Sequence, residues 1–170
     1  MGIFNLDSKT GDAAINLPHY HGVPNFPENW PSELVLHDDV QKLEIRPRTN
    51  FGGGKESVFL PYHKITGVLL TTEKEIKEQG KSVLGRAALG GILLGPLGAV
   101  VGGMSGTGKK QSVKYQMALI INYKSNPEDE DVKVISFINN TFGNAKKFAD
   151  MLKARAKIVD VVVPTGPITL

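Results

Sequence analysis

The sequence of 170 residues predicts a mainly β (α+β) domain that one C-terminal helix closes and one apolar insertion interrupts. Three observations lead to this fold class. Several segments between 40 and 138 alternate apolar and polar residues as strands do, residues 140–159 carry apolar residues at helical spacing, and residues 87–108 contain no charge. A chain of this length can bury about 70% of its unfolded surface in one core. We therefore expect a single body with one long insertion.

The expected strands are identified by alternation and by their content of β-branched and aromatic residues. In the first of them, Leu43 and Ile45 alternate with charged residues until Pro47 ends the segment. The longest alternating run, 113–124, is followed by an acidic turn at 126–131, which predicts a hairpin with the next segment. In chain order, the expected strands are 40–47, 57–62, 64–72, 113–124 and 132–138.

The last regular element is an amphipathic helix. Asn140 or Thr141 is the expected N-cap, because short polar side chains accept hydrogen bonds from the first amides of a helix. A set of residues recurs at helical spacing opposite four lysines, which predicts that one face packs on the sheet. The members of this set are Phe148, Met151, Leu152, Arg155 and Val159, and the lysines are Lys146, Lys147, Lys153 and Lys157.

The two ends of the chain are expected to lie outside this body. Residues 1–33 contain Pro18, Pro24, Pro27 and Pro31 and show neither helical nor strand periodicity, so we interpret them as an extended N-terminal arm. The expected division is an arm at 1–33, a body at 34–160, an insertion at 81–111 within that body, and an extended tail at 161–170.

The insertion has an unusual composition, since its 22 uncharged residues from 87 to 108 include eight glycines. The glycines recur about every four residues, which on a helix places them along one face where two backbones can approach closely. A straight helix would carry Pro96 in its interior at a cost of about 3 kcal/mol. A hairpin that turns at Gly95 and Pro96 avoids this cost, and each arm then spans about half a bilayer.

The residues expected to act in membrane insertion or oligomer packing are the repeated glycines and the apolar residues at the turn. They are Gly91, Leu93, Leu94, Gly95, Pro96, Gly98, Gly102 and Gly106. Basic residues flank the apolar stretch on both sides and are expected to contact an anionic surface. They are Lys81, Arg86, Lys109 and Lys110. Both flanks would then lie on one side of the membrane, as the two ends of a hairpin require.

Charge and composition argue against several other function classes. The net charge is +3, yet residues 1–39 sum to about −5 and residues 40–125 to about +8, so the positive charge surrounds the insertion. Because the basic residues do not alternate with aromatic ones, a membrane surface explains them better than nucleic acid does. The alternative is that solvated lysines only keep an apolar segment soluble. The absence of cysteine excludes disulfides and thiolate metal sites.

No group of residues predicts catalysis, a metal or a cofactor. Gly103 to Lys109 match the first seven positions of a phosphate-binding loop, but Lys110 stands where a magnesium-binding hydroxyl is required. A strand pattern follows, whereas the phosphate loop requires the start of a helix. His19 with His21, and the run His37 to Asp39, lack the spacing of a zinc or iron site. We therefore expect a protein that is not an enzyme.

The N-terminus carries no cationic start followed by an apolar core, so no cleaved secretory signal is expected. The lack of cysteine fits a cytoplasmic location. We expect a cytoplasmic protein that is peripheral to the inner face of the membrane or anchored there by the hairpin.

Two local segments resemble bacterial pleckstrin-homology-like (PH-like) domains. Leu60 to Val68 is similar to a strand motif of that family, and Phe137 to Asn140, leading into Ala145 to Ala149, is similar to its last strand and closing helix. The glycine-rich stretch 84–99 resembles an insertion between central strands in some members. The resemblance covers about residues 35–158. It implies a partly open β-barrel or orthogonal sandwich with one capping helix and a glycine-zipper-like helical hairpin insertion, and it implies binding rather than catalysis.

Two functions are consistent with these observations. The first is a membrane-associating, self-assembling protein whose PH-like body presents the hairpin for membrane insertion or oligomer packing. The alternative is a soluble PH-like module that binds a protein or a lipid headgroup and uses its hairpin only for homo-oligomerisation. The expected partners are further copies of the chain, a membrane or a protein, and not a nucleic acid.

Overall fold

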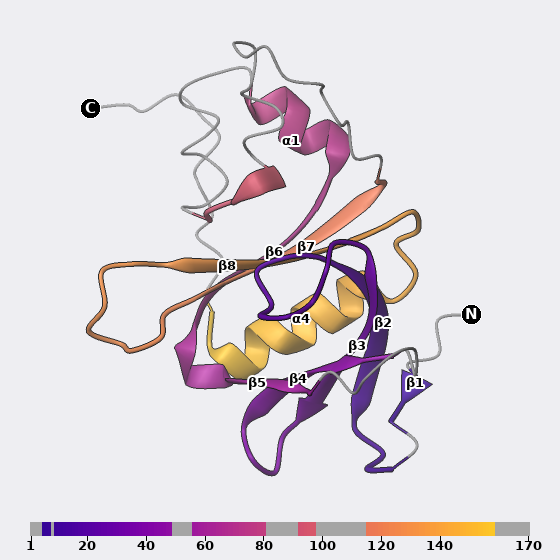
Figure 1. Cartoon of the computed structure of the whole chain (residues 1–170), viewed down its shortest axis with the longest axis vertical. Coiled ribbons are helices and arrows are strands. Elements are labelled where there is room, and N and C mark those ends of the chain that lie inside the picture. The colour runs from indigo at the N-terminus through magenta and orange to yellow at the C-terminus, as the bar shows by residue number, and fades with distance from the viewer. Residues whose placement is uncertain (1–4, 8, 49–55, 81–91, 98–114, 159–170) are drawn as a thin grey trace, which may run out of the picture.

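One antiparallel sheet and a helix packed against it form the body of the protein (Figure 1). The computed structural model describes residues 5–7, 9–48, 56–80, 92–97 and 115–158. Neighbouring strands follow the order β5-β4-β3-β2-β8-β7-β6, and β1 pairs with β2. The strands are β1 (Asn5–Leu6), β2 (Ala13–His21), β3 (Trp30–His37), β4 (Lys42–Pro47), β5 (Val58–Pro61), β6 (Ile65–Thr72), β7 (Met117–Tyr123) and β8 (Lys133–Asn139).

The mainly β fold class and the C-terminal helix are confirmed. The five strands expected from the sequence are present as β4 to β8, and β7 and β8 form the expected hairpin around the acidic turn. The helical elements are η1 (Tyr62–Lys64), which joins β5 to β6, α1 (Glu73–Gly80) and α4 (Ala145–Ala156). Figure 1 shows α4 lying between the half of the sheet with β6 to β8 and the half with β3 to β5.

Helix α4 starts later than the sequence suggests. The expected caps at Asn140 and Thr141 are wrong, because Asn144 is the N-cap. A turn precedes the helix, closed by a 2.9 Å hydrogen bond from the Ala145 amide to the Phe142 carbonyl, with Gly143 at a φ of 45°. This left-handed residue prevents the helix from extending towards Asn140. The buried face that contains Phe148 and Leu152 is as expected.

The interpretation of residues 1–33 as an arm outside the body is wrong for residues 5–6 and 30–33, which belong to β1 and β3, and above all for residues 13–21. These residues form β2, which lies between β3 and β8 in the middle of the sheet. Leu17 of this strand is 2% exposed. Pro18 hides the strand pattern in the sequence, but it is in register with Pro31 of β3. The amide hydrogens that both prolines lack therefore fall at one position of the ladder.

The sheet is buried on both faces along β7. Leu119 and Ile121 point into the main core, which lies between the sheet and α4, whereas Ala118 and Ile120 point to the opposite face. All four are 0% exposed. A second hydrophobic cluster, here called the outer cluster, covers that opposite face. Its buried members are Ile76, Leu97, Tyr115, Ala118, Ile120 and Ile138.

Helix α1 covers part of the outer cluster and was not anticipated from the sequence. The Thr72 hydroxyl accepts a hydrogen bond from the Glu75 amide at 3.0 Å, and the Glu75 carboxylate accepts one from the Thr72 amide at 3.0 Å. This reciprocal pair is a capping box, in which a Thr and a Glu three residues later satisfy amides at the start of a helix. Ile76, 1% exposed, follows at once and packs into the outer cluster.

Candidate functional site

The centre of the insertion lies on the outer face of the sheet. Ile92–Leu97, here called the docked segment, is the part of the insertion that the structure describes. In Figure 1 it lies on the side of β7 and β8 that faces away from α4. Leu97 is 1% exposed and belongs to the outer cluster, while Ile92 and Leu94 pack against that cluster from its edge.

The local conformation of the docked segment differs from a helical hairpin. Gly95 forms a turn with a φ of 58°, and the helical conformation begins at Pro96. Proline suits the first position of a helix because its fixed φ matches and its missing N–H would have no partner there. Residues 92–94, however, are not helical. The expected turn at Gly95 and Pro96 is present, but the expected helical arm does not include the residues directly before it.

A single asparagine holds this non-helical stretch. The Asn122 side chain accepts a hydrogen bond from the Leu93 amide at 2.7 Å and donates one to the Leu93 carbonyl at 2.9 Å. Asn122 lies on β7 and is 2% exposed. A buried amide side chain is costly without partners. The backbone of Leu93 therefore supplies both hydrogen-bond partners of the Asn122 side chain. In a helix, the Leu93 amide would instead donate to a carbonyl of that helix.

The connection that contains α1 and the insertion leaves and re-enters the sheet at the ends of two neighbouring strands. β6 and β7 are antiparallel neighbours, and Thr72 at the end of β6 is in register with Met117 at the start of β7. The chain therefore departs and returns side by side. This is the arrangement that a hairpin needs if its two flanks are to face the same surface.

The sequence-predicted site residues divide into two groups. Leu93, Leu94, Gly95 and Pro96 lie in the docked segment, where Leu93 is 49% exposed. The remaining ones lie outside the described residues: Gly91, Gly98, Gly102, Gly106, Lys81, Arg86, Lys109 and Lys110. The sequence did not predict that Asn122 would bind the backbone of Leu93. The signal available was the uninterrupted apolar run at 117–121, which is typical of a strand buried on both faces.

A network of charged side chains covers the outer face of β3 and β4 instead. The Arg46 guanidinium donates to Glu44 at 2.9 and 3.2 Å, to Asp7 at 3.0 Å and to Glu33 at 3.2 Å. Hydrogen bonding to Arg46 lowers the pKa of the Asp7 carboxyl to about 2. Burial alone would raise the pKa of Glu44, but hydrogen bonds to Arg46 and His37 outweigh it and lower that pKa to about 2. Both carboxylates therefore stay ionised across the neutral range.

His37 joins this network between two carboxylates. Its Nδ1 lies 2.7 Å from Asp12 Oδ2, and its Nε2 lies 2.7 Å from Glu44 Oε2. Burial would lower the pKa of His37, but the hydrogen bonds to Glu44 and Asp12 raise it above its ordinary value. A ring with both nitrogens facing carboxylates is an imidazolium that donates twice.

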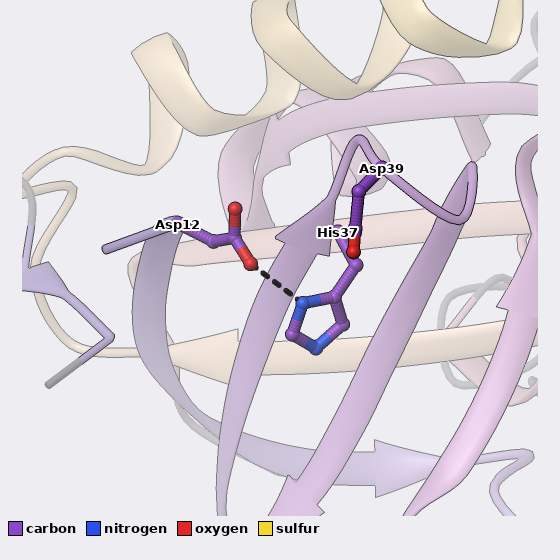
Figure 2. A group of neighbouring side chains, drawn as sticks. All are labelled: Asp12, His37 and Asp39. Atoms are coloured by element: carbon purple, nitrogen blue, oxygen red, sulfur yellow. Dashed lines mark hydrogen bonds and ion pairs between the residues drawn. The ribbon is translucent and has the colours of Figure 1, made fainter. Parts of the chain in front are cut away.

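Asp12, His37 and Asp39 also form a group of potential metal ligands, with one ligand atom each within 4.8 Å of the others (Figure 2). Figure 2 shows Asp12 directed at the ring of His37. A metal would have to replace the proton on Nδ1, because a protonated ring nitrogen has no lone pair to donate. The hydrogen bonds and the raised pKa favour a proton at this position. The sequence suggested a group of His37 with Asp39 but did not include Asp12. Asp12 directly precedes β2, and the pairing of β2 with β3 brings it next to His37.

His19 has a packing role. Its Nδ1 is 3.0 Å from the Pro27 carbonyl, and its Nε2 accepts a hydrogen bond from the Val23 amide at 3.1 Å. Burial lowers the pKa of His19. A ring that donates at one nitrogen and accepts at the other is neutral. Because both partners of His19 belong to the β2–β3 loop, His19 holds that loop in place. His21, the second imidazole of the sequence pair, is exposed.

Among the described residues, no helix has both the length and the apolar character needed to cross a membrane.

The fold and the insertion agree with a comparison to known families. A family model described as "Glycine zipper containing PH domain" matches residues 29–152. The chain belongs to this family. In the sequence, the glycine-rich stretch lies between β6 and β7. A PH domain with a glycine zipper is a binding or membrane-associated module. No curated protein and no solved structure matches the chain.

Proposed function

We propose that this glycine-zipper PH domain is a non-enzymatic module that assembles with copies of itself and associates with a membrane through its insertion. The observation that carries the proposal is that the connection containing the insertion starts and ends at neighbouring strand ends, where Thr72 and Met117 are in register. A hairpin that starts and ends at one point can enter a surface from one side. The PH domain then stays on the cytoplasmic side as the water-exposed body.

The sequence of the insertion supports assembly in particular. Its seven large aliphatic residues give only about −2 to −4 kcal/mol of insertion free energy before the cost of the glycines. One copy alone is therefore marginally stable in lipid. Glycine faces become favourable when another helix lies against them, since close backbone approach replaces the missing side-chain contacts. Several copies that pack through Gly98, Gly102 and Gly106 would meet this requirement.

The basic flanks support an anionic surface as the target. Each Lys or Arg close to such a surface contributes about 1 kcal/mol. Lys81 and Arg86 precede the apolar stretch, and Lys109 and Lys110 follow it. No acidic residue occurs between Glu78 and Glu128 to offset them.

Flotation with liposomes tests membrane association. The intact chain should float with anionic vesicles at low salt, and replacement of Lys81, Arg86, Lys109 and Lys110 by Gln should weaken binding by a few kcal/mol. Added salt should have a similar effect, because surface attraction is screened beyond about 8 to 10 Å at physiological ionic strength. Deletion of residues 85–108 should leave only weak, salt-sensitive binding.

The matched control replaces four exposed lysines of the body by Gln: Lys42, Lys74, Lys133 and Lys147. This variant has the same net charge as the test variant. Equal loss of flotation in both would show a nonspecific charge effect, and no flotation of the intact chain with any vesicle would remove the membrane function.

Self-assembly is tested by Gly98→Leu with Gly102→Leu. Leucine is the better helix former, so helicity is kept while close approach of backbones is lost. The oligomer mass measured in detergent and in buffer should fall, with the circular dichroism of the sheet unchanged. An unchanged mass would show that the glycine face is not an interface.

A second function is favoured by the docked segment. Leu97 packs against the body and is 1% exposed, so the body itself can shield the centre of the insertion from water. A soluble PH module that binds a protein or a lipid headgroup, with the insertion serving only homo-oligomerisation, would keep that shielding permanently. Assembly in buffer without flotation would favour this second function.

A further inference from the structure

The docked segment is held by hydrogen bonds to the backbone of Leu93 and by close packing at Gly95. Asn122 donates and accepts one hydrogen bond each with Leu93, at 2.9 and 2.7 Å. This is the pattern by which a neighbouring strand would pair with Leu93. Because Asn122 is 2% exposed, its amide loses both protein partners if the segment departs.

Two glycines make room for the contact, one on each side. A Cβ added to Gly67 of β6 would lie 2.2 Å from Ile92 Cδ1, so the terminal methyl of Ile92 occupies the space beside Gly67 and would have to move. A Cβ added to Gly95 would lie 3.4 Å from the Cβ of Val134 on β8, so the turn of the docked segment rests directly on that strand. The two surfaces are therefore fitted to one another at three points of the segment.

Docking uses the apolar side chains that lipid insertion would also use. Leu97 is fully buried in the outer cluster, and Ile92 and Leu94 pack on it. Leu93 alone among the four is largely exposed, at 49%. The side chains of Ile92, Leu94 and Leu97 cannot pack on the outer cluster and on lipid or a second insertion at the same time.

We propose that the outer face of β6, β7 and β8 is a resting site for the docked segment, and that Ile92–Leu97 must leave it before the insertion enters lipid or packs on another copy. This inference rests on the proposed function and adds that release of the docked segment controls insertion and assembly. Docking and insertion are two states of one equilibrium, and a change that weakens docking alone shifts the population towards insertion.

Two substitutions on the sheet release the segment without altering the insertion itself. Asn122→Ala removes both hydrogen bonds to Leu93, and Gly67→Val places a side chain where Ile92 Cδ1 now lies. Thr66→Val is the control, because Thr66 is the exposed neighbour of Gly67 on β6. Each net hydrogen bond changes an equilibrium constant about fivefold, so release should raise vesicle partitioning on the order of tenfold.

A disulfide locks the segment in place and can be undone in the same sample. The chain has no cysteine, and the 3.4 Å between the Cβ positions of 95 and 134 is close to the range of a disulfide. Gly95→Cys with Val134→Cys should float poorly when oxidised and recover after reduction. Strain from a side chain at the φ of 58° is present in both forms and cancels in the comparison.

Hydrogen exchange reports docking in buffer without any lipid. The Leu93 amide should exchange slowly in the intact chain and in Thr66→Val, and fast in Asn122→Ala. Exchange that is fast in all three, with the β7 amides still protected, would show that the resting site does not exist.

The outcomes separate this inference from the proposed function. If the intact chain floats and neither release nor the oxidised lock changes that, the resting site exerts no control and the inference is wrong while the proposed function stands. If neither the intact chain nor the released variants float or assemble, the proposed function fails and the inference fails with it. Flotation that rises on release and falls on oxidation supports both.

Discussion

The two halves of the sheet cover their outer faces in opposite ways. On β3 and β4, Arg46 and His37 bind the carboxylates of Asp7, Asp12 and Glu44. On β6 to β8 the corresponding face is apolar and is covered by α1 and the docked segment. The first cover is built from side chains of the strands themselves and of the nearby N-terminal residues. The second comes from the connection between β6 and β7, so it is separable from the sheet.

This difference separates the half of the sheet that the proposed release of the docked segment leaves unchanged from the half that it alters. Partly buried ion pairs stabilise the outer face of β3 and β4 at neutral pH, since both Asp7 and Glu44 remain charged. The outer face of β6 to β8 is covered in part by Ile92–Leu97 of the glycine-rich insertion. Under the release proposed above, the body stays fixed while the insertion exchanges one apolar environment for another.

The largest effect is expected from breaking the charged cover. Arg46→Met leaves the carboxylates of Asp7 and Glu44, which are 3% and 9% exposed at the side chain, without their shared cation. Removal of one partner of a buried ion pair costs about 3 to 5 kcal/mol. Chemical denaturation should show this loss in the free energy of unfolding. The control Glu33→Gln removes a more exposed contact of the same guanidinium and should cost under about 1 kcal/mol.

The next effect tests the apolar cover. Ile120 is 0% exposed on the outer face of β7, and Ile120→Ala should lower the free energy of unfolding by about 2 to 4 kcal/mol because it leaves a cavity. A cost below about 0.5 kcal/mol is typical of an exposed site and would mean that the outer face is open in solution. Leu119→Ala, on the inner face of the same strand, gives the value for a core position.

The pH dependence of stability distinguishes the charged half from the apolar half. The raised pKa of His37 means that its stabilising contribution is fully present below its ordinary value of 6.5 and is lost as the pH rises through the folded value. Thermal unfolding should therefore show decreasing stability above pH 6.5. His37→Gln should be flatter over that interval. The same slope in both proteins would show that His37 is not the group responsible.

The smallest effect concerns the start of α1. Thr72→Ala removes one half of the capping box with Glu75 and should cost about 1 kcal/mol. Because α1 carries Ile76 into the outer cluster, the loss should appear as faster hydrogen exchange in α1 and in the β6–β7 edge, with β3 and β4 unaffected. A uniform loss over the whole sheet would show that the two halves unfold as one unit.

Several features were determined by the sequence alone. Alternation together with β-branched and aromatic content placed β4 to β8, the helical spacing of Phe148 and Leu152 gave the buried face of α4, and the uncharged glycine-rich stretch located the insertion. These signals are local, because each depends on the period of one element. The capping box at Thr72 and Glu75 was equally local, and it would have predicted α1.

Other features were decided only by the tertiary structure. β2 contains a proline and lacks clear alternation, and its strand conformation follows from pairing with β3 and β8. The contacts of Asn122 with Leu93 and of Arg46 with Asp7 join residues 29 and 39 positions apart. No period in the sequence encodes such pairs, because they depend on which strands become neighbours. That is also why Gly95 and Pro96 were recognised as a turn, while the surface that holds them was not.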